Sequence, residues 1–121
     1  MTIRQAIALV DEKKHNVYSR EEKLRWLSEQ DGEVWAYLCG FQGFDGPFRG
    51  YTEVDYPQGK LLLELPFDRL YLHWLEARID YANQEYTKFN NAMALHRAVW
   101  RDFTAWCCRN YRPKAQSLRY F

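Results

Sequence analysis

The sequence predicts a small all-α protein, a bundle of about four helices built on a long antiparallel helical hairpin. Three observations predict this fold class. Apolar residues recur at spacings of three and four in four separate segments. Two of these segments open with a hydroxyl residue followed three positions later by Gln or Glu, as helix N-termini do. Five of the six glycines and two of the four prolines are gathered in residues 39–60.

The first two helices are expected to begin after Thr2 and Ser19. Thr2 is followed by Gln5 and Ser19 by Glu22, so each pair can form a capping box. The first apolar stripe is short and stops at the polar stretch DEKKHN. Asp31 interrupts the longer second stripe and Gly32 follows it, so we expect the second helix to bend or split there. The apolar positions of the two stripes are Ile3, Ala6, Ile7 and Val10, then Leu24, Leu27, Val34 and Leu38.

Residues 39–60 form an aromatic, glycine-rich insertion that cannot be helical. An insertion with this much aromatic surface is expected to fold against another part of the molecule. The run LLLEL at 61–65 is expected to be a strand or an extended segment that leads into Pro66. The aromatic residues of the insertion are Phe41, Phe44, Phe48, Tyr51 and Tyr56.

The hairpin is predicted between Pro66 and Tyr111. Pro66 is expected to open the third helix, whose apolar residues cover most of its circumference and so predict a central position. A change of phase at Asn83 and Gln84 predicts a tight turn, which Asn90 and Asn91 could help to tie. The last helix should continue to about Tyr111, because Pro113 prevents its extension. Its predicted core seam is Tyr86, Phe89, Met93, His96, Trp100, Phe103 and Cys107.

Composition excludes several classes of protein. The 121 residues suffice for one domain, which we expect to span 1–121, and the formal net charge of +1 does not suggest a nucleic-acid binder. No apolar run approaches the roughly 20 residues that a membrane span requires, and the N-terminus lacks the order of a signal peptide. We therefore expect a cytoplasmic protein without membrane contact. The 17% share of aromatic residues must be buried or face a partner.

Few residues suggest chemistry. His73, Glu76 and His96 could approach one another, but helical metal sites draw paired carboxylate and histidine elements from several helices, and this chain has one. Cys107 and Cys108 have arginines nearby in sequence but no histidine within a helical turn. The glycine-rich insertion lacks the G-K-[ST] ending of a phosphate loop. The acidic second helix and the long stretch before it disfavour a helix-turn-helix reader of DNA. We expect no catalytic residue, metal or cofactor.

Two stretches, SREEKLRWLSEQDGEVW and LPFDRLYLHWLEARIDYANQEYTKFNNAMALHRAVWRDFTAW, resemble the head-to-tail connector or head completion proteins of tailed phages and prophages. The resemblance covers about residues 3–113 and is weakest between 40 and 60. It is a pattern of aromatic and asparagine positions, with no catalytic motif. The matching positions are Tyr71, Trp74, Asp80, Tyr81, Glu85, Tyr86, Asn90 and Asn91.

The resemblance implies a virion structural protein whose copies form a ring between the portal and the tail. Portal and tail-side phage proteins would be its partners, and DNA would pass through the ring without sequence-specific binding. The protein would occupy the bacterial cytoplasm until it enters the virion. The alternatives are a small non-enzymatic regulatory or peptide- or DNA-binding module of phage origin, and an enzyme or small-ligand protein around His73, Glu76 and His96.

Contacts between subunits or with partners are predicted for the insertion and for the basic tail, residues 112–121. Both are surfaces with no evident use inside a small helical domain, which suits a contact between different patches on successive copies. The residues proposed for these contacts are Phe41, Phe44, Phe48, Arg49, Tyr51, Tyr56, Arg112, Lys114, Arg119, Tyr120 and Phe121.

Overall fold

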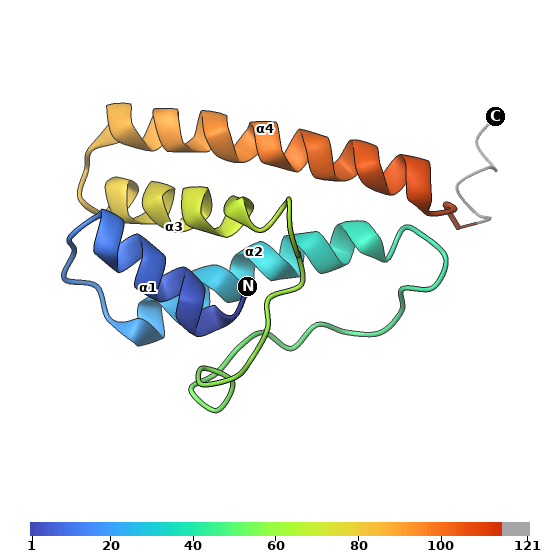
Figure 1. Ribbon diagram of the computed structural model, residues 1–121, viewed down its shortest axis with the longest axis horizontal. Helices are drawn as coiled ribbons and strands as arrows, with labels where there is room; N and C mark the ends of the chain where they lie inside the picture. The colour runs from blue at the N-terminus through green and yellow to red at the C-terminus, as the bar shows by residue number, and fades with distance from the viewer. Residues whose placement is uncertain (115–121) are drawn as a thin grey trace.

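Four helices form the fold, as predicted (Figure 1). The structure is a computed structural model that describes residues 1–114. Within that range there is no strand, only isolated antiparallel bridges between Thr2 and Lys60 and between Phe41 and Pro113. No helix in the described range has the length and apolar character needed to cross a membrane. The helices are α1 (Ile3–Lys13), α2 (Arg20–Leu38), α3 (Arg69–Ala82) and α4 (Tyr86–Asn110).

The predicted N-termini of α1 and α2 are confirmed. At α1 the Gln5 amide donates to the Thr2 hydroxyl at 3.1 Å, and the Gln5 side chain accepts from the Thr2 amide at 2.8 Å, which completes a capping box. At α2 the Ser19 hydroxyl accepts from the Glu22 amide at 3.1 Å. The Glu22 carboxylate lies 3.4 Å from the same hydroxyl, so the reciprocal bond to the backbone is not made.

The expectation that α2 splits at Asp31 and Gly32 is wrong. The helix continues through both residues to Leu38. Asp31 lies in the apolar stripe because its carboxylate is used inside the protein, where it accepts hydrogen bonds from Tyr51 and Tyr71. A polar residue in an apolar stripe here marks an internal anchor and not the end of a helix.

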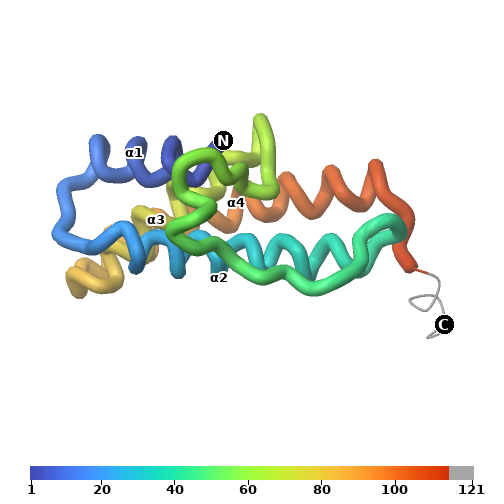
Figure 2. The backbone as a smooth tube through the Cα atoms, turned by 90° about the horizontal axis from the view of Figure 1, so that it is seen from below, coloured from blue at the N-terminus to red at the C-terminus, as the bar shows by residue number. Residues whose placement is uncertain are grey.

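The segment between α2 and α3 contains no strand. Residues 61–65 are extended, with Leu61 and Leu63 buried, and the Leu61 amide donates to the Met1 carbonyl at 3.1 Å. Pro66 does not open α3, since a turn that follows the cis Leu65–Pro66 bond precedes the first helical residue, Arg69. Seen from below, the insertion follows α2 along much of its length (Figure 2).

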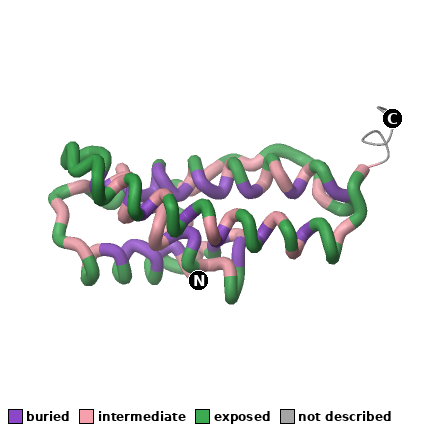
Figure 3. Tube along the Cα trace, turned by 90° about the horizontal axis from the view of Figure 1, so that it is seen from above, coloured by how far each residue is buried: buried purple, intermediate pink, exposed green. Residues whose placement is uncertain are grey.

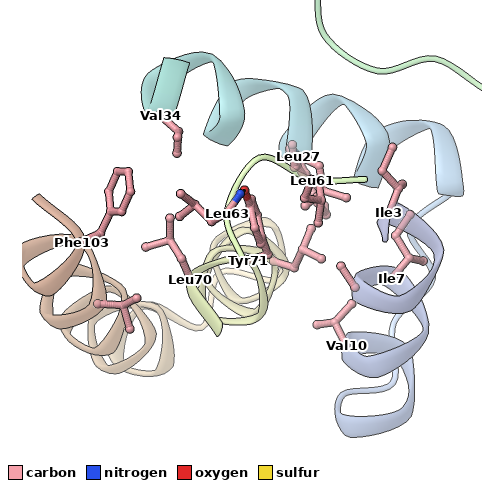
Figure 4. Packing of buried hydrophobic residues seen from close by; sticks show 14 of the residues in the cluster. Ile3, Ile7, Val10, Leu27, Val34, Leu61, Leu63, Leu70, Tyr71 and Phe103 are labelled. Atoms are coloured by element: carbon pink, nitrogen blue, oxygen red, sulfur yellow. The ribbon is translucent and has the colours of Figure 1, made fainter. Parts of the chain in front are cut away.

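Helix α3 occupies the centre of the molecule, as its apolar circumference predicted. It packs against α1, α2 and α4, and its contact with α4 is the most extensive. The tight turn is confirmed, with Gln84 at a φ of 61°, and α4 ends one residue before the expected Tyr111. The core is built around α3 and the extended segment (Figure 4), and its labelled members are Ile3, Ile7, Val10, Leu27, Val34, Leu61, Leu63, Leu70, Tyr71 and Phe103.

The predicted seam of α4 is only partly buried. His96, Phe103 and Cys107 lie in the core, but Tyr86 is 53% exposed. A strict seven-residue repeat on a straight helix drifts by about 20° per repeat. The late position Phe103 packs against Phe67 and against Tyr37 of α2, with ring centroids 5.5 and 6.2 Å away. The early position Tyr86 lies instead beside Tyr81 at the exposed end of the hairpin. Ala92 and Val99, which flank the seam, are buried in their place.

Candidate interaction surfaces

The three residues considered for chemistry do not form one site. His73 Nδ1 lies 3.6 Å from Glu76 Oε1, and the same carboxylate oxygen lies 3.5 Å from Lys13 Nζ. His96 is buried between α2 and α4, where its Nε2 lies 2.5 Å from Gln30 Oε1. Within residues 1–114 no three His, Cys, Asp or Glu side chains are grouped as metal ligands would be. The geometry supports an ion pair between Glu76 and Lys13 and a packing role for His96.

Titration of His96 is expected to weaken the fold in acid. Burial, with further contributions from His73 and Arg97, lowers the pKa of His96 to about 4. Its unfolded pKa is about 6.5, so the neutral ring stabilises the fold above that pH, and this contribution is lost as pH falls towards 4. Relative to His96→Gln, the wild type should lose about 2 to 3 kcal/mol between pH 7 and pH 4 in urea unfolding. A pH-independent difference between the two proteins would contradict this assignment.

Asp31 connects three segments that are distant in sequence. The Asp31 side chain is 0% exposed, and it accepts hydrogen bonds from the Tyr71 hydroxyl at 2.5 Å, the Leu62 amide at 3.0 Å and the Tyr51 hydroxyl. The Tyr71 hydroxyl in turn accepts from the Leu63 amide at 2.8 Å. We call this group the Asp31 node. It fastens the insertion and the extended segment to α2 and α3.

The electrostatics of the Asp31 node keep the two tyrosine hydroxyls protonated, so that both can donate hydrogen bonds. Burial raises the pKa of the Asp31 carboxyl, although hydrogen bonds from Tyr51, Tyr71 and the Leu62 amide oppose that rise. Burial and the adjacent carboxylate raise the pKa of both tyrosines, so their hydroxyls remain protonated and can donate. Asp31 has no ion pair with any described residue, so hydrogen bonds alone compensate its burial.

Most aromatic residues of the insertion are already used inside the chain, which confirms that the insertion folds against the body. Phe41 is buried between Tyr37 and Tyr111, with ring centroids 5.4 and 6.0 Å away. Phe44 packs 5.0 Å from Tyr111, and Phe48 packs 5.4 Å from Tyr51.

Tyr56 packs against two arginine side chains, whereas Arg49 is exposed. The guanidinium carbon of Arg20 lies 4.2 Å from the centroid of the Tyr56 ring, and that of Arg4 lies 5.3 Å away. Arg49 is exposed. The role of the insertion in partner contacts stays a prediction.

Replacing Tyr51 with phenylalanine is expected to loosen the insertion. The change removes one donor from the buried Asp31 carboxylate, which should cost about 1 to 2 kcal/mol in urea unfolding. Trypsin should also cleave faster after Arg49, which lies two residues away and is exposed. Tyr86→Phe is the matched control, because the Tyr86 side chain is half exposed on α4. Equal stability and equal cleavage rates for the two variants would contradict the anchoring role of Tyr51.

The start of the basic tail is fastened to the insertion. The Gln42 amide donates to the Arg112 carbonyl at 2.7 Å, and the Lys114 amide donates to the Gly40 carbonyl at 3.0 Å. Lys114 Nζ also lies 2.8 Å from the Asp45 carboxylate. Lys114 is thus engaged within the chain, whereas Arg112 is exposed. Arg119, Tyr120 and Phe121 lie outside the described residues.

A surface that the sequence prediction missed lies at the turn between α3 and α4 (Figure 3). Tyr81 and Tyr86 are 50% and 53% exposed, and the ring of Tyr81 lies 5.7 Å from that of Tyr86 and 5.2 Å from that of Phe89. Glu85 and Lys88 form an ion pair beside them, with an N–O distance of 2.9 Å. We call these five residues the hairpin-tip surface. The drift of the heptad pattern was the signal that could have revealed it.

The positions that carry the connector resemblance divide into two groups. Tyr71 belongs to the Asp31 node, Trp74 donates to the Trp26 carbonyl at 2.7 Å, and buried Asp80 pairs with Lys14 at 2.5 Å. The fold itself requires this group. The second group is exposed around the turn and consists of Tyr81, Glu85, Tyr86, Asn90 and Asn91.

Comparison of this chain with protein-family models, with curated proteins and with solved structures found no match.

Proposed function

We propose that this protein is a virion structural protein of a tailed phage or prophage, a head-to-tail connector subunit whose copies form a ring between portal and tail. The observation that carries the proposal is that the positions of the connector resemblance divide into a buried group and an exposed group. The buried group packs and makes hydrogen bonds inside the fold. The part at the hairpin tip, including Tyr81 and Tyr86, is exposed and has no comparable internal use.

The hairpin-tip surface has the character of a contact site. Tyrosine is enriched in protein interfaces because it offers a large apolar ring together with a hydroxyl. Tyr81 lies in the last turn of α3 and Tyr86 begins α4, so both side chains stand on a hairpin held by the most extensive helix contact among the described residues. A rigid surface loses little conformational entropy on binding. In this proposal the hairpin tip meets a neighbouring subunit, the portal or a tail-side protein.

DNA would pass through the ring without sequence-specific contacts. The formal net charge of +1 suits such a passage, since a strongly basic lining would hold the phosphate backbone. The alternative function, a phage-derived regulatory or DNA-binding module, predicts an affinity for duplex DNA that falls steeply with salt. A connector subunit outside its assembly has no need of that affinity.

Disruption of the gene in its phage or prophage tests the proposal. After induction, DNA-filled heads and separate tails should accumulate without joining, as seen by electron microscopy of the lysate. Expression of the wild-type chain from a plasmid should restore infectious particles. Joined particles at the wild-type yield in the disrupted strain, or salt-sensitive binding to duplex DNA by the isolated chain, would oppose the proposal.

A further inference from the structure

An apolar groove lies between α1 and the turn that precedes α3. Its volume is about 530 Å³, and its lining residues are Met1, Gln5, Ala8, Leu9, Leu65 and Asp68. The groove exists because the extended segment passes beside the start of α1 (Figure 1), where the Leu61 amide donates to the Met1 carbonyl at 3.1 Å. Two large apolar side chains in it are exposed to solvent, Leu9 at 41% and Leu65 at 83%.

The fold does not use these two leucines. The buried face of α1 is formed by other residues, and Leu9 points away from it. Asp68 lies at the rim of the groove, and its side chain makes no capping hydrogen bond to α3. Its carboxylate also forms no ion pair within residues 1–114. The groove therefore suits a short segment that combines large apolar side chains with one cation.

The chain contains such a segment beyond the described residues. Residues 115–121 read AQSLRYF, in which Leu118, Tyr120 and Phe121 are apolar and Arg119 lies among them. The three apolar side chains match Leu9 and Leu65 in character, and the guanidinium matches the carboxylate of Asp68.

We propose that residues 115–121 of one copy dock in this groove on the next copy. The inference rests on the proposed function, because it supplies a contact by which the subunits join. The tail and the groove are different patches, so the contact is heterologous and can be repeated from copy to copy, as a ring requires. Lys114 is held by Gly40 and Asp45 just beyond the end of α2. The first half of α1, which lines the groove, lies away from that end of the molecule (Figure 1).

The first test measures binding of the tail in isolation. A fluorescent synthetic peptide of residues 114–121 is titrated into the full-length protein and followed by anisotropy. It should bind saturably, and at least about tenfold more weakly to Leu9→Glu, in which a charge enters the groove. Leu95→Glu is the matched control, since Leu95 is 55% exposed on α4. Absence of saturable binding to the wild type, or equal loss in both variants, overturns the inference.

A charge exchange tests the pairing of Asp68 with Arg119. A peptide carrying Arg119→Asp should bind the wild-type protein about tenfold more weakly and recover affinity for the Asp68→Arg protein. Recovery in that combination alone identifies the two charges as partners. Equal affinity of both peptides for both proteins would show that the Asp68 carboxylate does not pair with Arg119.

The second test asks whether the contact joins two copies. Leu9→Glu and the double variant Tyr120→Ser with Phe121→Ser should each be monomeric in light scattering at concentrations where the wild type self-associates. Their mixture should form dimers of one copy of each and nothing larger, because one groove and one tail remain intact per pair. A monomeric wild type, or a mixture that stays monomeric, overturns docking between copies. Self-association that neither variant affects overturns the inference while leaving the proposed function intact.

Discussion

Replacing Asp31 with alanine is expected to lower the free energy of unfolding by about 2 to 4 kcal/mol. The change removes the acceptor of two tyrosine hydroxyls and the Leu62 amide. It leaves the buried Tyr71 hydroxyl and two partly buried donors without this partner. The insertion and the extended segment would lose their common anchor on α2. Urea unfolding followed by far-UV circular dichroism measures the loss, and tryptophan fluorescence reports on the surrounding core.

Two variants control the Asp31 experiment. Asp31→Asn keeps one acceptor oxygen, so its loss should be smaller than that of alanine. Glu33→Ala lies two residues further along α2 with an exposed side chain, and its stability should stay within about 0.5 kcal/mol of the wild type. An alanine variant at position 31 as stable as Glu33→Ala would show that the Asp31 node does not hold the insertion.

Changing Tyr81 and Tyr86 together to serine is expected to abolish production of infectious particles while the isolated chain stays folded. Both side chains are about half exposed, so their removal costs the fold little, and a contact centred on them would lose its main apolar surface. Complementation of the disrupted strain measures the effect, with at least about a hundredfold drop in titre if the contact supplies about 3 kcal/mol.

Leu95→Ser is the matched control for the tyrosine variant. Leu95 is 55% exposed on α4, so the change removes a similarly accessible apolar group outside the hairpin-tip surface and the insertion. The control should complement fully, and circular dichroism should show equal helix content for all three proteins. Full complementation by the double tyrosine variant would exclude the hairpin tip as an assembly contact.

The helices could be predicted from the sequence because their signals are local. The pairs Thr2 with Gln5 and Ser19 with Glu22 lie within one helical turn, and each determined a helix start in the structure. The turn at Asn83 was likewise marked by a change of apolar phase over a few residues. Capping and periodicity depend on neighbours in sequence, so one sequence suffices to recognise them.

The Asp31 node could not be predicted because its members are far apart in sequence. Asp31 looked like a helix breaker, since only the folded chain brings Tyr51, Leu62 and Tyr71 to its carboxylate. The same limit applies to the insertion. That it folds against the body was predicted, but its packing partner Tyr111, which contacts Phe41 and Phe44, is too distant in sequence to be recognised.

The sequence contained a signal for the exposure of Tyr86, but the prediction gave it too little weight. Its position in the heptad pattern favoured the core, whereas the drift of that pattern along a straight helix favoured exposure. Leu9 differs, because it lies outside the predicted apolar stripe of α1 and its exposure agrees with the pattern. Both residues belong to surfaces now proposed for assembly.

The central claim, that this chain is a connector subunit, is tested most directly by quantitative mass spectrometry of purified virions. Isotope-labelled reference peptides from this chain and from the portal protein would give the ratio of the two in intact particles. The account predicts a fixed ratio that persists through repeated gradient purification and disappears in heads from the disrupted strain. Absence of the chain from purified infectious particles would contradict it.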